Sequence, residues 1–168
     1  MMRKLLCLLN AFLLLNFCSC TEVECPLDSV VVMTCGMYNA ETNEKMSVLQ
    51  TLTITPAGKD TTLLNMAQDI QDFVLPLKIG ATCDTMLFHF SDSWENKVTD
   101  TLYIYHDNMP HFESVECPAA VFHKLSAVEW RNDASSKTSV FIDSVAIVRE
   151  LVDYNDIENL QIYLRNAH

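Results

Sequence analysis

The sequence predicts an all-β protein folded as a single antiparallel β-sandwich, immunoglobulin-like or transthyretin-like, with about seven to nine strands. Apolar and polar residues alternate with a period of two along most of the chain, as is typical of strands with one buried face. Short clusters of Asn, Asp, Gly and Pro separate these runs and mark turns.

The first two predicted strands, residues 29–38 and 48–55, are rich in β-branched residues. Residues 63–72 are the only segment that could be helical, although their apolar spacing fits a helix poorly. A third strand is predicted over residues 73–79. Its apolar side consists of Phe73, Leu75, Leu77 and Ile79. Because Pro76 cannot donate a backbone hydrogen bond, this strand is expected at a sheet edge or a bulge.

Four later runs alternate in the same way. Their expected buried faces consist of Met86, Phe88 and Phe90; Leu102 and Ile104; Val140, Ile142, Ala146 and Val148; and Leu160, Ile162 and Leu164. Leu87, His89, Tyr103 and Tyr105 fall on the opposite faces. The sequence shows no internal repeat and no second domain, so residues 27–168 are expected to fold as one unit.

The N-terminal segment is typical of an export signal. Two positive residues precede an apolar stretch, residues 5–17, which is shorter than the roughly 20 residues needed to cross a bilayer. The run FCSC at 17–20 looks like a loose lipobox, in which a peptidase cleaves before a cysteine that carries diacylglycerol. We therefore predict a lipoprotein signal peptide over residues 1–19, lipidation of Cys20 and a tether over residues 20–26. An ordinary secretory signal is the alternative.

The predicted mature chain is strongly acidic. The whole chain has a formal net charge of −11, and loss of Arg3 and Lys4 with the signal would make it about −13. Such a surface repels nucleic acid and anionic lipid headgroups. No nucleic-acid partner is expected, and the membrane would be held through the acyl chains of the lipid anchor.

Four cysteines besides Cys20 remain after the predicted cleavage. An even number in an exported chain favours two disulfides, whereas none of the spacings suits a zinc site. Of the three possible pairings, we predict Cys25 with Cys117 and Cys35 with Cys83, since Cys25 precedes the first strand and Cys117 follows a late one.

Three segments carry a resemblance to a known family: the lipobox, the run DTLYIYHDNMPHFESVEC at 100–117 and the ending FIDSVAIVRELVDYNDIENLQIYL at 141–164. The whole mature chain resembles an uncharacterised family of small Bacteroidota lipoproteins. Pro118 stands where members of that family carry glycine. The resemblance implies a location at the outer membrane, on either face, and an outer-membrane β-barrel protein as a candidate partner. It implies no catalytic residues.

Little in the sequence indicates catalysis. Three glycines leave no Gly-rich phosphate loop. The stretch HDNMPH offers His106, Asp107 and His111 as candidate metal ligands, although a hydrated turn is the commoner meaning of such a stretch. The acidic segment 153–159 suggests calcium but lacks the glycine that an EF-hand loop needs. We therefore expect no enzyme activity, no cofactor and no bound metal.

Exposed aromatic side chains offer a possible binding surface. Tyr103 and Tyr105 share one strand face, and Trp94 and Trp130 lie near the ends of strands. Such side chains could bind sugar rings or a protein, or could simply support the sheet through cross-strand contacts. The sequence thus predicts a non-catalytic binding or accessory module of the outer membrane. The alternatives are a fimbrial subunit that polymerises by strand addition and a metal-dependent enzyme.

Overall fold

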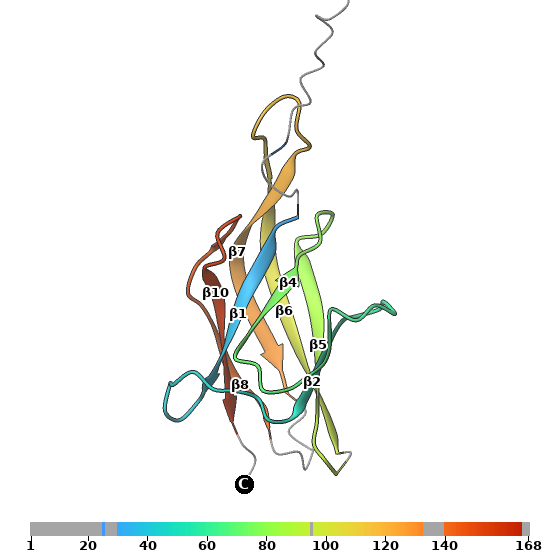
Figure 1. The fold of residues 1–168 in the computed structure, drawn as a ribbon, viewed down its shortest axis with the longest axis vertical. Helices are drawn as coiled ribbons and strands as arrows, with labels where there is room; N and C mark the ends of the chain where they lie inside the picture. The colour runs from blue at the N-terminus through green and yellow to red at the C-terminus, as the bar shows by residue number, and fades with distance from the viewer. Residues whose placement is uncertain (1–24, 26–29, 95, 133–139, 166–168) are drawn as a thin grey trace, which may run out of the picture.

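Ten β-strands and no helix make up the part of the chain that the computed structural model describes, residues 25, 30–94, 96–132 and 140–165 (Figure 1). The strands are β1 (Val32–Asn39), β2 (Thr51–Pro56), β3 (Leu64–Ala67), β4 (Asp72–Pro76), β5 (Cys83–Ser91), β6 (Lys97–His111), β7 (Ala120–Arg131), β8 (Phe141–Ile147), β9 (Leu151–Val152) and β10 (Glu158–Arg165). The all-β class is confirmed. Nothing in this described part is a helix that could span a membrane.

The strand count exceeds the predicted range because β3 and the two-residue β9 add to it. The segment expected as the only possible helix, residues 63–72, instead contains β3 and the start of β4. Within it, Met66 and Asp69 have φ angles of 46° and 53°. These angles are incompatible with a right-handed helix.

Two sheets share one hydrophobic core. The first has the strand order β4-β1-β10-β8 and the second the order β3-β2-β5-β6-β7-β9. Leu75 and Leu160 of the first sheet belong to the same buried cluster as Leu102 of the second. Phe73 of the first sheet meets Phe88 of the second edge to face, with ring centroids 6.0 Å apart. The arrangement is sandwich-like. Whether it is immunoglobulin-like or transthyretin-like stays a prediction.

The prediction of a wholly antiparallel fold was wrong for one pair, since β1 and β10 run parallel in the centre of the first sheet. Cys35 pairs with Leu160 and Met37 with Ile162. A parallel pair needs a long connection, and here all the other strands lie in sequence between the two partners. The first and last strands therefore close the sheet side by side.

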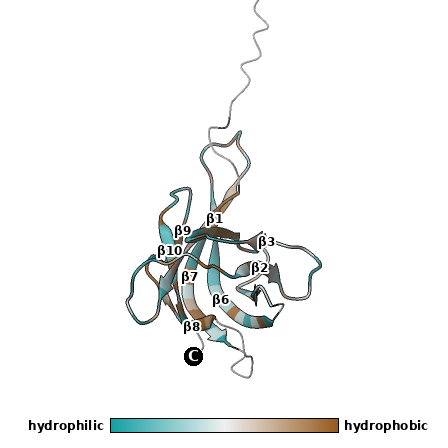
Figure 2. Ribbon diagram, turned by 60° about the horizontal axis from the view of Figure 1, so that its bottom comes forward, coloured by the Kyte–Doolittle hydropathy of each residue, from teal (hydrophilic) through white to brown (hydrophobic). Residues whose placement is uncertain are grey.

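The alternation of buried and exposed residues confirms most of the predicted strand faces. On β5, Met86, Phe88 and Phe90 are buried while Leu87 and His89 face outward. The same alternation buries Leu102 and Ile104 on β6 and Leu160, Ile162 and Leu164 on β10. Figure 2 shows hydrophobic and hydrophilic residues alternating along the strands.

β4 is an edge strand, as Pro76 predicted. It ends at this proline, so the prediction that Ile79 continues its buried face was wrong. Ile79 lies in the turn that follows and is 66% exposed.

The predicted buried face of β8 was correct only in its first part. Val140 and Ile142 are buried, but Val148 is exposed and Ala146 only partly buried. The pairing of β8 with β10 shifts register between Tyr163 and Leu164. Such a bulge changes which residues face the core, and Val145 is buried instead.

A hydrogen-bonded group lies on the outer side of the β1–β10 pair. The Tyr38 hydroxyl donates to both carboxylate oxygens of Glu158 at 2.9 and 3.1 Å, and the Gln161 side-chain amide donates to the same carboxylate at 2.8 Å. The carboxylate occupies the space that a side chain at Gly36 would need. Gly36 is therefore required for close approach rather than for a special backbone angle.

We expect Gly36→Ala to lower the free energy of unfolding by about 1–3 kcal/mol. The added Cβ would overlap the Glu158 carboxylate, which would have to leave its hydrogen bonds to Tyr38 and Gln161. Urea denaturation measures the change. Gly80→Ala is the matched control, because no atom lies within 4 Å of a Cβ placed there. Equal stability of the two variants would contradict this role of Gly36.

Candidate functional site

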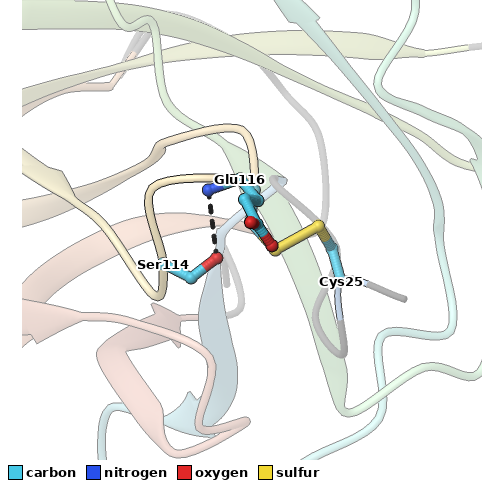
Figure 3. Close-up of a disulfide and its surroundings, with 4 residues drawn as sticks. Cys25, Ser114 and Glu116 are labelled. Carbon is cyan, nitrogen blue, oxygen red and sulfur yellow. Dashed lines mark hydrogen bonds between the residues drawn. A yellow bond between two sulfur atoms is a disulfide. The ribbon is translucent and has the colours of Figure 1, made fainter. Parts of the chain in front are cut away.

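The predicted disulfide between Cys25 and Cys117 is present, with Cα atoms 5.6 Å apart and a sequence separation of 92. Figure 3 shows it beside the turn that joins β6 to β7, where the Glu116 backbone N–H donates to the Ser114 hydroxyl at 3.2 Å. The chain before β1 is thus fixed covalently to the β6–β7 turn. The predicted signal peptide, Cys20 and most of the predicted tether lie outside the described residues.

The predicted pairing of Cys35 with Cys83 was wrong, because both are free cysteines. Cys35 lies on β1 of the first sheet with its side chain wholly buried in the core, whereas Cys83 begins β5 of the second sheet and is only partly buried. Burial raises the pKa of the Cys35 thiol well above its usual range, which keeps it protonated and unreactive.

The structure does not bring the three candidate metal ligands together. His106 is buried, and its Nε2 lies 3.1 Å from Asp84 Oδ2. Asp107 is exposed on the other face of β6. His111 stacks on Phe122 with ring centroids 4.2 Å apart, and its Nε2 lies 2.9 Å from a carboxylate oxygen of Glu113. Among the described residues, no group of three His, Cys, Asp or Glu side chains is placed to hold a metal.

His106 belongs instead to a buried polar cluster with Asp84, His123 and Asn108. The two histidine rings meet edge to face with centroids 4.9 Å apart, and His123 Nδ1 lies 2.8 Å from Asn108 Oδ1. The Asn108 amide donates to the carbonyl oxygens of Ile79 and Ala81 at 2.9 and 2.7 Å. The cluster therefore joins β5, β6 and β7 to the turn between β4 and β5, which is a structural task.

This cluster gives the fold a pH dependence. Burial, with the neighbouring His106, lowers the pKa of His123 to about 4, and Asp84 opposes this shift only in part. An unfolded histidine has a pKa of about 6.5, so His123 stabilises the fold fully above that pH. Its contribution is lost as the pH falls from about 6.5 towards 4, because protonation then favours the unfolded chain.

We expect His123→Gln to weaken this pH dependence, since glutamine keeps a polar group for Asn108 but does not titrate. Urea denaturation at several pH values between 7.5 and 4.5 measures the slope of stability against pH. The stability of the variant will still depend on pH, although less steeply, because burial also lowers the pKa of His89. An unchanged slope in the variant would show that His123 is not the responsible group.

The acidic segment 153–159 holds an ion pair. Arg149 donates from both terminal nitrogens to Asp153, at 3.0 and 2.7 Å, and this bond lowers the pKa of the Asp153 carboxyl. Asn159 is buried and donates to the carbonyl oxygens of Arg149 and Leu151. These groups fold the turn around β9 and are occupied by partners within the chain.

A groove crosses the outer side of the second sheet at the β5–β6 turn. It consists of two hollows of 380 and 350 Å³ that share Thr51 and Ser91. Trp94 and Leu49 line the first hollow and Met66 lines the second; these three side chains are 82%, 78% and 69% exposed. We call this feature the distal groove, because the β5–β6 turn with Trp94 lies at the end of the molecule opposite the β6–β7 turn (Figure 1), to which the disulfide is attached.

Hydrogen bonds to the Asp92 side chain stabilise the turn that presents Trp94. The Asp92 carboxylate accepts hydrogen bonds from the backbone N–H groups of Trp94 and Asn96 at 2.8 and 3.0 Å, and from the Asn96 side chain at 2.9 Å. The Asn96 side-chain bond lowers the pKa of Asp92, so this carboxyl stays ionised and occupied. The turn thus fixes the backbone at Trp94, and the Trp94 side chain is exposed.

Polar side chains make up most of the lining of the second hollow, together with Met66 and Phe90. His89 contacts two hydroxyl groups, with Nε2 3.1 Å from Thr55 Oγ1 and Nδ1 2.9 Å from Thr99 Oγ1. Burial lowers the pKa of His89, so the ring is neutral at pH 7. The groove can thus offer aromatic, apolar and hydroxyl contacts, and its histidine is already engaged.

Sequence reasoning found only part of this groove. It singled out Trp94 but not Leu49, Met66 or Gln68, which come from loops and the short strand β3 and meet through the pairing of β2 with its neighbours. The other predicted aromatics lie elsewhere. Tyr103 and Tyr105 are partly buried on β6, and the Tyr105 hydroxyl lies 3.4 Å from Glu129 on β7, the cross-strand contact that supports a sheet. Trp130 lies on β7 and is 37% exposed.

Comparison with protein families gives a match between residues 51–164 and DUF6452, a family of unknown function. The match covers more than half of the chain. The chain belongs to the DUF6452 family. The expectation of an uncharacterised domain family is thereby confirmed, and its description as a Bacteroidota lipoprotein family stays a prediction. No curated protein and no solved structure matches the chain. The matched segment runs from β2 to β10 and includes Trp94.

Proposed function

We propose that this DUF6452 protein is a lipid-anchored protein of the cell envelope, attached to the outer membrane through Cys20, that acts by binding rather than by catalysis. The loose lipobox at residues 17–20 supports lipid anchoring, and the disulfide between Cys25 and Cys117 supports export. The acidic net charge of −11 makes a nucleic-acid partner unfavourable.

The observation that carries the proposal is the position of the distal groove relative to the disulfide. β6 joins them: the turn with Trp94 precedes its first residue, and the turn with Cys117 follows its last. A strand of 15 residues spans roughly 45–50 Å. Figure 1 shows the two turns at opposite ends of the molecule.

This geometry would orient the domain on a membrane. Cys20 precedes Cys25 by only five residues, and Cys25 is bonded to the β6–β7 turn. A lipid on Cys20 would therefore hold that end near the bilayer and point the distal groove away from it. Anchoring also raises the local concentration of the domain for any partner in the same membrane, which lets weak contacts suffice.

The chemistry of the groove favours binding over catalysis. A general base needs a free nitrogen or carboxylate near the reacting group. His89 is engaged on both ring nitrogens, and Asp92 is engaged in its turn. Both free cysteines lie on the strands β1 and β5 and line neither hollow of the groove.

The fimbrial alternative is less well supported. A subunit that polymerises by strand addition takes a strand from a neighbour to complete its own sheet. Here β10, near the end of the chain, already lies between β1 and β8 of its own sheet, paired on both sides. The interior of that sheet is therefore filled within one chain.

Photocrosslinking in native cells tests the proposal. p-Benzoylphenylalanine is placed at Leu49 in the distal groove or, as the matched control, at Val115, which is fully exposed at the disulfide end. We expect a defined high-mass adduct at position 49 and none at position 115, and Cys20→Ser should abolish the adduct. Adducts that form equally at both positions, or that persist in the Cys20→Ser variant, would contradict the proposal. An outer-membrane β-barrel protein is the candidate partner that mass spectrometry of the adduct would identify.

A further inference from the structure

We infer that the distal groove binds an uncharged oligosaccharide, with Trp94 as the stacking platform. This inference rests on the proposed binding function and names the class of ligand. It is argued from the exposed indole, the hydroxyl and amide groups around it, the shape of the groove and its charge.

Trp94 provides the platform. Its side chain is 82% exposed, although burying an indole is strongly favourable, and the hydrogen bonds of Asp92 keep the turn from folding it inward. The face of an indole carries negative charge density, and the C–H groups on one face of a sugar ring carry slight positive charge. A sugar ring laid on Trp94 would bury both apolar faces while its hydroxyls stay at the rim.

Side chains near Trp94 can form hydrogen bonds with the hydroxyl groups of such a sugar. Gln68 Nε2 donates to Thr51 Oγ1 at 2.8 Å, which orients the amide and leaves its oxygen as an acceptor. Because Thr51 Oγ1 accepts this bond, its own hydroxyl hydrogen remains to be donated. Ser91 and Ser93 place two more hydroxyls on the same hollow. Paired donors and acceptors of this kind match the vicinal hydroxyls of a sugar.

The shape fits a chain of sugars. The two hollows of 380 and 350 Å³ share Thr51 and Ser91 and so adjoin one another at the sheet surface. Each hollow falls within the size range of small-molecule sites. Met66 extends the apolar surface into the second hollow, where a neighbouring sugar would lie.

The negative charge of the protein favours an uncharged sugar over an anionic one as the ligand. The chain carries a net charge of −11, and Asp92 adds a carboxylate to the rim of the first hollow. Lys97 is the cation that lines the second hollow, against the negative field of the whole molecule. Sulfated or phosphorylated glycans would therefore be disfavoured.

Intrinsic fluorescence of the full chain in detergent tests the inference, because the chain has two tryptophans. Trp130→Phe leaves Trp94 as the single emitter and is also the matched control for binding. Maltohexaose, cellohexaose and mannohexaose are titrated, with dextran sulfate as the anionic comparison. We expect at least one neutral hexasaccharide to cause a saturable blue shift of Trp94 emission. Calorimetry should show the same affinity for wild type and Trp130→Phe, and binding at least tenfold weaker for Trp94→Ala.

The inference is overturned if none of the three neutral oligosaccharides gives a saturable shift, if Trp94→Ala binds as tightly as wild type, or if dextran sulfate binds more tightly than all three. A protein adduct at position 49 together with no saccharide binding would remove the glycan inference and leave the proposed binding function standing. Saccharide binding with no lipid on Cys20 would remove the proposed membrane anchoring and leave both the binding function and the glycan inference standing.

Discussion

Replacing Asp84 with alanine is expected to lower the free energy of unfolding by about 3 kcal/mol or more, the largest effect of any single polar substitution considered for this fold. Asp84 is fully buried. Its Oδ2 accepts a hydrogen bond from the backbone N–H of Lys78 at 2.8 Å and lies 3.1 Å from His106 Nε2, while Lys78 Nζ lies 3.1 Å from Oδ1. Removing the carboxylate would leave several polar groups unpartnered inside the protein.

Urea denaturation at neutral pH measures this loss. Asp107→Ala is the matched control, since Asp107 lies on the adjacent strand β6 but is exposed, and should change stability by less than about 0.5 kcal/mol. Asp84→Asn keeps one oxygen as an acceptor for Lys78 and should fall between the two. If Asp84→Ala were as stable as Asp107→Ala, the buried cluster would not hold β5 and β6 together as described.

Loss of the Cys25–Cys117 disulfide is expected to lower the free energy of unfolding by about 4.5 kcal/mol, because the bond closes a loop of nearly a hundred residues in the unfolded chain. The bond also holds the chain before β1 against the β6–β7 turn (Figure 3). Cys25→Ser should therefore shift the urea midpoint strongly downward.

Two controls separate the effect of losing the disulfide from the effect of replacing a cysteine. Cys83→Ser changes a free, partly buried cysteine and should have only a small effect. Dithiothreitol should destabilise the wild type by the same amount as Cys25→Ser and leave the variant unchanged. An equal midpoint with and without dithiothreitol in the wild type would contradict the predicted stabilisation.

The alternation of the sequence predicted the buried faces of β5, β6 and β10 well, because buried residues alternate along all of β5, along β6 as far as His106 and along β10 from Leu160. The prediction of buried faces failed where the alternation of buried and exposed residues is interrupted. A bulge in β8, where Asp143 is the extra residue between Ile142 and Ser144, places Val145 in the core, and the alternation of the β8 sequence does not reveal it. The pairing of Cys35 with Cys83 failed for a related reason, since alternation does not tell which sheet a strand joins.

The candidate site, too, could be predicted only in part from the sequence. Trp94 could be predicted because an aromatic residue in a polar turn is conspicuous in the sequence. Leu49, Met66 and Gln68 could not, since they reach the groove through pairing between strands that are distant in sequence. The histidine pair His106 and His111 suggested a metal because the stretch was interpreted as a turn, whereas β6 continues through it and the same alternation that buries Leu102 and Ile104 also buries His106.

The central claim, a disulfide-bonded domain anchored by lipid at Cys20, is tested most directly by the intact, non-reduced mass of the protein extracted from its native membrane. We predict the mass of residues 20–168 plus a diacylglyceryl group and any further acyl chain, less the two hydrogens lost in forming the Cys25–Cys117 disulfide, with Cys35 and Cys83 as thiols. A mass without lipid would contradict the account, because nothing would then hold the disulfide end at the membrane and point the distal groove away from it.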